Sequence, residues 1–376
     1  MRYIGNKEKL LANIYDAVLS TGVNSGSFCD FFAGTASVGR FFKSRGFSVV
    51  SADLLYSSYV LQKAYVENNE EPEFNGLYSA GIIGAGGFAQ SRLEVVLDKL
   101  NSQPGIRGFI FRNYTEDGTR GDEVQRMFFT PQNGQRIDAI RTTIENWNND
   151  GLLKENEYFI LLAALVESVP FYANISGVYG AFLKQYDPRA LKKFVIRPIQ
   201  IYKSHLRHSV HNVNSMDMAQ KLDVDILYLD PPYNQRQYGS NYHLVETIAK
   251  YDAPEIYGVA GLRNYSEQKS EFCNAKTALA ALEKIASTAK YRYMILSYNS
   301  EGIMPTGEIM KVLGRAGSCK LVGVEYRRFR SNSNGEAKTK KTIQEQLFIL
   351  ENPRTKAPGS FGALQSRPMV AAKMAC

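Results

Sequence analysis

One short stretch, Asp230-Pro231-Pro232-Tyr233, places the strongest limits on how this chain can fold. It follows residues 225–229 (Asp-Ile-Leu-Tyr-Leu), an apolar run that is typical of a buried parallel strand. Two consecutive prolines cannot continue a hydrogen-bonded ladder, so the strand must end there. A carboxylate, a rigid turn and an aromatic ring therefore stand at the carboxyl end of a strand, which is where open α/β sheets bind their ligands.

The same four residues have the chemistry to hold a flat ring that carries an exocyclic amino group. The carboxylate of Asp230 and the backbone carbonyl freed at Pro231 accept N–H hydrogen bonds, and the ring of Tyr233 offers a stacking surface. A plain strand-ending turn is the competing interpretation when the stretch is considered alone. Motifs elsewhere in the chain are needed to distinguish a binding site from a plain turn.

A strand–turn–helix unit lies near the start of the chain. Residues 27–32 have the pattern of a strand and lead through a turn of small residues into a helix, as in nucleotide-binding βα units. Ala36 replaces the middle glycine of a strict fingerprint, which favours a cofactor without phosphates. Asp53 ends the next strand, about 20 residues beyond the turn, where a carboxylate accepts hydrogen bonds from ribose hydroxyls. A helix N-cap is the competing role for Asp53.

The opening residues, Arg2-Tyr3-Ile4-Gly5-Asn6-Lys7, precede an amphipathic helix. Gly5 lets the backbone approach a ligand closely, and Lys7 near a helix start can hold an anionic group. An ordinary N-terminal turn with a solvated lysine is the favoured interpretation of this stretch by itself.

The strand–helix rhythm lapses between residues 73 and 205 and then returns. We therefore expect residues 1–72 and 206–351 to form one Rossmann-like α/β domain, a seven-stranded sheet with helices on both faces. Residues 73–205 are expected to be an insertion, and the Pro/Gly/Ser-rich residues 352–376 a flexible tail. Residues 321–326 and 344–350 have the pattern of a terminal antiparallel pair.

The chain is basic, with 45 Lys and Arg against 37 Asp and Glu, a net charge of +8 and a pI near 9.1. This balance favours a polyanionic partner such as nucleic acid. A basic segment that begins at Lys184, with only Asp187 opposing it, is the best candidate for phosphate contacts. Six arginines in the insertion are of the type that reads base edges, although for each one a surface salt bridge is the favoured interpretation. They are Arg107, Arg112, Arg120, Arg126, Arg136 and Arg141.

The four cysteines lie far apart and lack the spacing of metal ligands, and the histidines have no supporting carboxylate or cysteine pattern. We therefore expect no metal site and a reducing, cytoplasmic location. No apolar run reaches membrane-spanning length and no signal peptide is recognisable, so no membrane partner is expected.

Together these motifs, in this order, resemble the class alpha, Dam-like DNA N6-adenine methyltransferases of type II restriction–modification systems. The resemblance covers most of residues 1–350. It rests on the opening Arg-Tyr-Ile-Gly-Asn-Lys, on Asp-Phe-Phe-Ala-Gly-Thr at 30–35, on Asp53, and on the 230–233 turn with its Asn-Gln-Arg-Gln-Tyr continuation.

The resemblance implies S-adenosylmethionine as methyl donor and double-stranded DNA as substrate, with direct transfer to an adenine N6 after the base is flipped out. It implies that Asp230 and the Pro231 carbonyl hold the target amino group within a turn completed by Pro232, and that Tyr233 stacks on the base. The implied cofactor residues are Tyr3, Lys7, Asp30, Phe32, Ala33, Gly34, Asp53 and Asp217. The implied DNA contacts are Lys184, Arg189, Lys192, Lys193, Arg236 and Tyr238.

The resemblance further implies that residues 73–205 recognise the DNA target, and that methylation protects host DNA from a separately acting cognate restriction endonuclease. Cytosine N4, RNA adenine and protein glutamine are alternative methyl acceptors, and a DNA-binding module without catalysis is a further alternative. Aspartate as the first residue of the turn and the basic, aromatic insertion favour adenine in duplex DNA.

Overall fold

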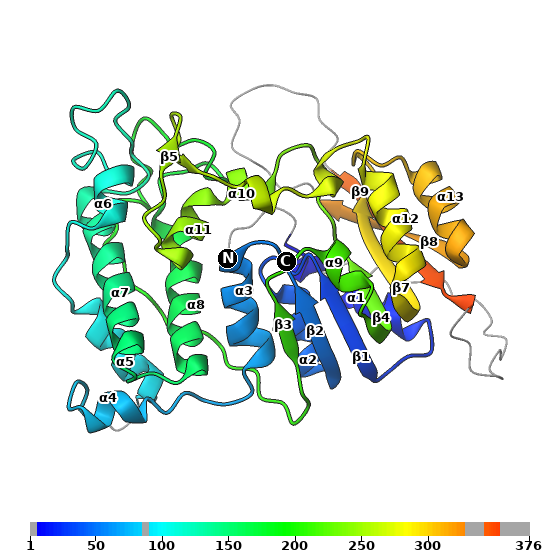
Figure 1. Ribbon diagram of the computed structural model, residues 1–376, viewed down its shortest axis with the longest axis horizontal. Helices are drawn as coiled ribbons and strands as arrows, with labels where there is room; N and C mark the ends of the chain where they lie inside the picture. Colours follow the sequence, from blue (N-terminus) through cyan, green and yellow to red (C-terminus); the bar gives the residue numbers. More distant parts are fainter. Residues whose placement is uncertain (1–5, 85–89, 328–341, 354–376) are drawn as a thin grey trace, which may run out of the picture.

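The computed structural model describes residues 6–84, 90–327 and 342–353, and it contains a central sheet beside a layer of helices (Figure 1). Within these residues the sheet has seven strands in the order β3-β2-β1-β4-β7-β9-β8. The first five are parallel, whereas β9 is antiparallel to both of its neighbours. The strands are β1 Gly26–Phe31, β2 Phe47–Ala52, β3 Ser209–His211, β4 Asp223–Leu229, β7 Lys290–Asn299, β8 Ser318–Arg327 and β9 Thr342–Glu351.

This architecture confirms the predicted fold class, the strand that ends at the double proline and the terminal antiparallel pair. Two sequence expectations cannot be placed, because Tyr3 and the part of the predicted tail from residue 354 onward lie outside the described residues. Residues 328–341, between β8 and β9, lie outside them as well.

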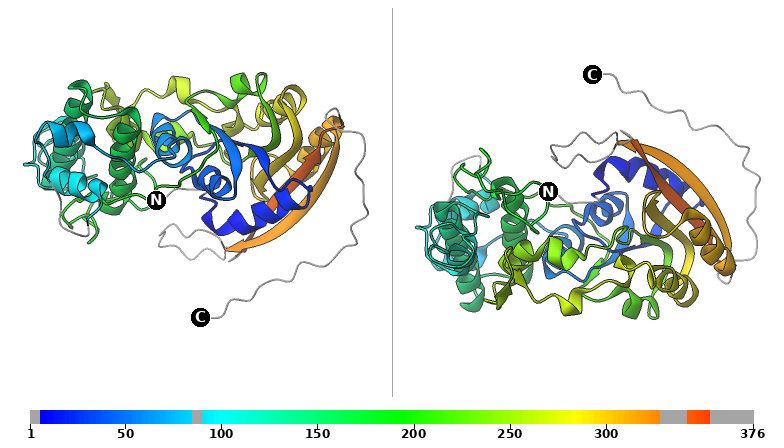
Figure 2. Two further views of the ribbon diagram at one scale, coloured as in Figure 1. Left: turned by 90° about the horizontal axis from the view of Figure 1, so that it is seen from below. Right: turned by 90° about the horizontal axis from the view of Figure 1, so that it is seen from above.

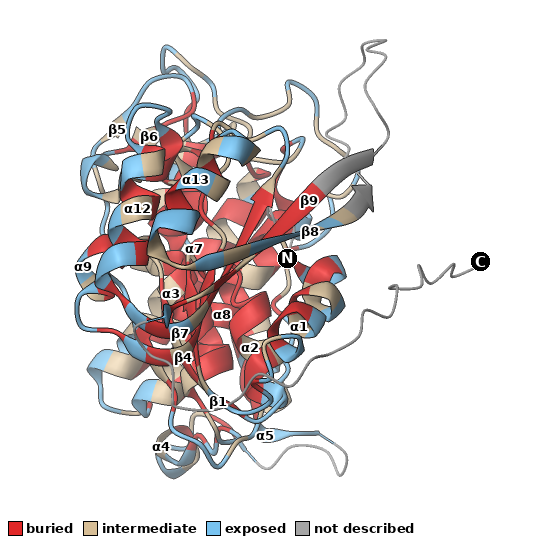
Figure 3. Ribbon diagram, turned by 90° about the vertical axis from the view of Figure 1, so that its right-hand side faces the viewer, coloured by how far each residue is buried: buried red, intermediate tan, exposed pale blue. Residues whose placement is uncertain are grey.

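Side chains alternate along the strands and pack against helices on both faces of the sheet. Phe28 and Ile226 face one helical layer, whereas their neighbours Cys29 and Leu227 face the other. The first layer contains α1 (Leu11–Leu19), α2 (Ser37–Ser44) and α3 (Tyr56–Gln62), and the second contains α9 (Ser215–Ala219), α12 (Ala278–Thr288) and α13 (Thr306–Ala316). Figure 3 shows buried residues along the strands and exposed residues on the outer sides of α12 and α13.

Residues 68–172, which follow η2 (Lys63–Glu67), form a mainly helical segment that lies at the opposite end of the molecule from α12 and α13 (Figures 1 and 2). Its helices are α4 Asn75–Ser79, α5 Arg92–Asn101, α6 Phe109–Tyr114, α7 Pro131–Asn149 and α8 Glu155–Tyr172. The sequence defines two of the starts, because Ser91 and Glu94 form a capping box at α5 and Thr130 caps α7 ahead of a proline.

Helix α8 joins this segment to the sheet. It is apolar on nearly all sides and packs against α3 and against α11 (His243–Lys250). One hydrophobic cluster therefore runs without interruption from the first face of the sheet into the helical segment. The boundaries of an inserted region at residues 73 and 205 stay a prediction.

Short elements complete the described chain. They are η1 Glu8–Leu10, η2 Lys63–Glu67, α10 Tyr238–Asn241, η3 Ser266–Gln268, η4 Glu271–Cys273 and the hairpin of β5 (Ile256–Tyr257) and β6 (Leu262–Arg263). Among the helices that the structure describes, none is both long enough and apolar enough to cross a membrane.

Candidate active site

The turn between β1 and α2 exposes its backbone to a cavity. Phe32, Gly34 and Ala36 all have left-handed conformations, with φ values of 64°, 51° and 58°. This region favours glycine, so Phe32 and Ala36 are strained there and must be held by their surroundings. The Ala33 N–H donates to the carbonyl of Ala52 at 3.2 Å, and the Ala36 N–H donates to the Ala33 carbonyl at 2.8 Å. The turn is thus fixed before any ligand binds.

Asp53 joins this turn to the one that follows β2. Its Oδ2 accepts the N–H of Gly34 at 2.9 Å, and its Oδ1 accepts the N–H of Leu55 at 2.9 Å. Burial raises the pKa of Asp53, and these N–H donors oppose that rise. Asp53 is not the N-cap of α3, because Leu55 occupies that position and Glu246 accepts the first N–H groups of the helix. Its carboxylate instead lines the cavity.

Asp230 stands at the end of β4 in a group of buried charges. The Nζ of Lys7 lies 3.1 Å from Asp230 Oδ1 and 2.5 Å from Glu345 Oε1. The Ser297 hydroxyl donates to the same Glu345 oxygen at 2.7 Å. Burial lowers the pKa of Lys7, but the two carboxylates outweigh burial and leave that pKa raised. Burial raises the pKa of Asp230 to about 7, although Lys7 opposes this.

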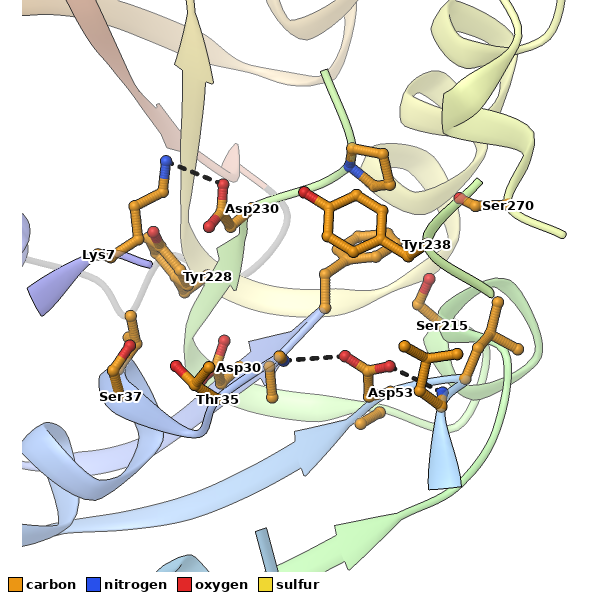
Figure 4. A pocket seen from close by; sticks show the side chains of 18 of the residues that line it. Lys7, Asp30, Thr35, Ser37, Asp53, Ser215, Tyr228, Asp230, Tyr238 and Ser270 are labelled. Atoms are coloured by element: carbon orange, nitrogen blue, oxygen red, sulfur yellow. Dashed lines mark hydrogen bonds and ion pairs between the residues drawn. The ribbon is translucent and has the colours of Figure 1, made fainter. Parts of the chain in front are cut away.

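Lys7, Asp53 and Asp230 line one cavity of about 840 Å³, a volume that includes its open mouth. Figure 4 shows Lys7 and Asp230 on one side and Asp53 on the other, with Asp30 between them. The residues proposed from the sequence that line it are Lys7, Asp30, Phe32, Ala33, Gly34, Asp53, Asp230, Pro232 and Tyr238.

Asp30 adds a second buried carboxylate to the floor of this cavity. Its Oδ2 accepts the N–H of Gly39 at 3.0 Å, which ties β1 to the first turn of α2. Burial raises the pKa of Asp30 well above its usual range, and the nearby Asp230 raises it further. A cavity lined by Asp30, Asp53 and Asp230 favours a ligand that carries positive charge over one that carries phosphates.

Several expected site residues do not line this cavity. Asp217 does not, although Val213 and Ser215 beside it do. Pro231 is buried outside the lining. Tyr233 is half-buried, also outside the lining, and lies against the hydrophobic cluster of the second sheet face. The stacking role of Tyr233 therefore stays a prediction.

The six expected DNA contacts fall into different settings. Lys184, Lys192, Lys193 and Arg236 are exposed. Arg189 is already bound to Asp187 through two hydrogen bonds of 2.9 and 3.2 Å. Tyr238 lines the cavity and stacks on Tyr242, with ring centroids 5.8 Å apart.

The sequence interpretation missed part of the cavity wall. Gln237 and Ser270 hold each other through the Ser270 backbone, with distances of 2.8 and 3.2 Å, and both line the cavity. It also missed Glu345. The sequence signal for this residue is that the polar residues 344–346 begin a strand whose remaining residues, 347–350, are apolar. Because β9 is antiparallel, its start lies beside the carboxyl end of β7, where Asn299 pairs with Glu345. The predicted pair of β8 and β9 does not include this contact with β7, so it did not place Glu345 near Asp230.

Comparisons with known proteins agree with this chemistry. The family model for D12 class N6 adenine-specific DNA methyltransferases matches residues 3–312. The chain is 40% identical over 356 residues to the type II methyltransferase M.FokI of Planomicrobium okeanokoites, across 93% of this chain and 52% of that protein. It is 37% identical over 360 residues to the type II methyltransferase M.NlaIII of Neisseria lactamica, across 93% and 99% respectively. The chain thus spans about half of M.FokI and almost all of M.NlaIII.

Proposed function

The chain belongs to the D12 class N6 adenine-specific DNA methyltransferases, and from this premise we propose that it methylates N6 of an adenine flipped out of duplex DNA by direct in-line transfer. The observation that carries the proposal is the position of Asp230 in the wall of the cavity that Asp53 and the glycine turn also line. One cavity thereby combines the groups expected to hold a methyl donor with the carboxylate expected to hold an amino group.

The residues of the cavity fit S-adenosylmethionine, the methyl donor of this family. When bound, this cofactor supplies a methyl group on a positively charged sulfur. Asp53 would accept hydrogen bonds from its ribose, and the backbone of residues 32–34 allows close approach. The carboxylates of Asp30 and Asp230 suit the positive charge.

Asp230 has the features required to prepare an exocyclic amine. Such an amine is a poor nucleophile because its lone pair is delocalised into the ring. The Asp230 carboxylate and the Pro231 carbonyl would accept its two hydrogens and favour a nitrogen whose lone pair is available. Positioning and electrostatics then supply the rate, and no covalent enzyme intermediate is needed.

The position of Asp230 supports the proposal of base flipping. Its side chain is only 17% exposed, so an adenine that remains stacked inside a duplex does not reach it. Extruding a base from the stack costs a few kcal/mol. The exposed residues Lys184, Lys192, Lys193 and Arg236 are proposed to offset this cost by binding phosphates.

We place this activity in restriction–modification, because the relatives are type II methyltransferases. The proposed biological role is to protect host DNA, in the cytoplasm, from a separately acting cognate restriction endonuclease. Residues 73–205 are proposed to recognise the DNA target.

Tritium transfer from labelled S-adenosylmethionine to plasmid DNA tests the proposal. We expect Asp230→Ala to reduce transfer by about 10³-fold or more, while calorimetry still detects binding of S-adenosylmethionine. Asp223→Ala, a change at an exposed aspartate at the opposite end of β4, is the matched control and should leave transfer unchanged. Persistent transfer by Asp230→Ala would refute the assignment. Nucleoside analysis of methylated DNA and of a matched RNA distinguishes adenine N6 from cytosine N4 and from RNA adenine.

A further inference from the structure

Three separate parts of the chain contribute the charged side chains of the buried group that contains Asp230. Lys7 comes from the N-terminal segment, Asp230 follows β4, and Glu345 lies on β9. The side chains of Lys7 and Glu345 are each only 6% exposed, whereas that of Asp230 is 17% exposed and lines the cavity. Asp230 is thus the member of this trio that is most open to a ligand.

Glu345 does not line the cavity, so it has no direct route to a bound substrate or cofactor. Its route is through Lys7, which it approaches more closely than Asp230 does, at 2.5 Å against 3.1 Å. Ser297 on β7 binds the same Glu345 oxygen from the other side at 2.7 Å. The position of the lysine ammonium is therefore fixed by Glu345 at least as firmly as by Asp230.

The sheet fixes where Glu345 itself lies. In the register of β7 and β9, Ser297 pairs with Leu347 and Asn299 pairs with Glu345. The carboxylate thus projects from a hydrogen-bonded strand and not from a loop. A charge on a strand keeps its place with little loss of side-chain entropy, which is what a preorganised site requires.

We propose that Glu345 is a positioning residue, which with Ser297 holds the Lys7 ammonium against Oδ1 of Asp230 and so sets the orientation and charge of the carboxylate that receives the target amino group. This inference rests on the function proposed above and adds a supporting shell to it. The chemical step itself remains the work of Asp230.

The charges around Asp230 make the inference testable by pH. Among the residues that the structure describes, five titratable groups face it: Lys7, Glu345, Asp30, Tyr228 and Tyr238. Burial is the main cause that raises the Asp230 pKa to about 7; Lys7 lowers that pKa and Glu345 raises it. The carboxylate must be ionised to accept amino hydrogens, so kcat/KM for DNA should fall as the pH drops below about 7.

The fall of kcat/KM at low pH is the acid limb of the pH profile. Removing the charge of Glu345 or that of Lys7 should move this limb, in opposite directions. Glu345→Gln keeps the shape of the side chain but removes a like charge, which favours ionised Asp230 and shifts the limb down by about 1 pH unit. Lys7→Met removes the opposite charge and shifts the limb up by a similar amount, about 1 unit. We expect Glu345→Gln also to lower the plateau rate about tenfold, with KM for S-adenosylmethionine within about twofold of wild type.

Glu157→Gln is the matched control. Glu157 is a buried glutamate of α8 that accepts the N–H groups of Phe74 and Lys154, far along the chain from the site. Its substitution should lower the free energy of unfolding without moving the acid limb. A second variant, Ser297→Ala, leaves all the charges in place and should lower the plateau rate a few-fold with the limb still near pH 7. This variant carries the test if Glu345→Gln does not fold.

The outcomes separate the two proposals. If Asp230→Ala abolishes transfer while Glu345→Gln keeps both the wild-type limb and the wild-type plateau, the positioning role is overturned and the proposed function stands. Wild-type rates in folded Ser297→Ala would likewise count against the positioning role. If Asp230→Ala itself still transfers methyl groups, the proposed site fails first.

Discussion

Charged side chains serve different purposes in the two parts of the molecule. At the carboxyl edge of the sheet, Lys7, Asp230 and Glu345 bind one another across strands and face or support a cavity. In the helical segment, buried and half-buried arginines bind backbone carbonyls. Arg136 donates to the carbonyls of Phe194 and Asn101, both at 2.7 Å. The first arrangement prepares chemistry, and the second holds loops and helix ends in place.

The comparison shows how weak a guide arginine content is to DNA contact. Arg141 donates to the carbonyls of Ile248 and Ala249 at the end of α11, and it also forms an ion pair with Glu145. Arg126 donates to the carbonyls of Gly258 and Val259. Both were possible base readers by residue type, yet both have structural partners. The exposed lysines 184, 192 and 193 lack that kind of partner among the described residues and are better candidates for phosphate contacts.

The largest effect should come from Arg141→Met. It leaves buried carbonyls at the end of α11 without a donor, and it removes the Glu145 partner, so we expect the free energy of unfolding to fall by about 3 kcal/mol. Urea denaturation measures this. Arg120→Met, at an exposed residue bound to Asp117, is the control and should change stability by less than about 0.5 kcal/mol. A stable Arg141→Met protein that no longer binds DNA would show that Arg141 contacts DNA and does not serve a structural role.

Asp53→Ala should cause the next largest effect. It removes the acceptor for the N–H groups of Gly34 and Leu55 and the expected ribose contact. We expect the affinity for S-adenosylmethionine to fall by about 10- to 100-fold, as measured by calorimetry. Asp53→Asn retains one acceptor oxygen and should lose less. Unchanged cofactor affinity in both variants would place the ribose elsewhere.

Replacing Lys192 and Lys193 together by alanine tests whether the exposed lysines contact DNA phosphates. If each contacts one phosphate, DNA affinity should fall by about tenfold, and the slope of log K against log salt should become shallower by about 2. Fluorescence anisotropy at several salt concentrations measures both. Sequence preference in methylation should not change, because phosphate contacts carry no base information. If the double variant keeps the wild-type salt slope, these lysines do not contact DNA phosphates.

Arg189→Gln should have the smallest effect. The Arg189 guanidinium is already bound to Asp187, so its charge is largely neutralised before DNA arrives. We expect DNA affinity within about twofold of wild type, in keeping with the small worth of partly exposed ion pairs. The same anisotropy measurement checks this, and a loss as large as that of the double lysine variant would show that the ion pair opens on DNA.

The parts of the fold that the sequence predicted share a local cause. Two prolines after an apolar run define the end of β4, and a turn of small residues between strand and helix defines the start of α2. Asp53 lies beside Gly34 because parallel strands bring their carboxyl ends to one edge. In each case the information lies within a few residues of the feature that it specifies.

The parts that were missed depend on contacts between distant residues. Glu345 reaches Lys7 across 338 positions of sequence, and Ser270 reaches Gln237 from a segment with no recognisable motif. Local patterns indicate where charges occur, whereas the folded chain determines which of them are already paired.

The antiparallel course of β9 has a consequence for the order in which a ribosome makes the protein. A nascent chain that has emerged as far as β8 already contains the glycine turn, Asp53 and Asp230, yet Lys7 has no Glu345 to bind. Strand β9, which follows β8 in the described residues, inserts between β7 and β8 and supplies that carboxylate. The sheet and the charged group are therefore both completed by the same strand, once β9 has been synthesised.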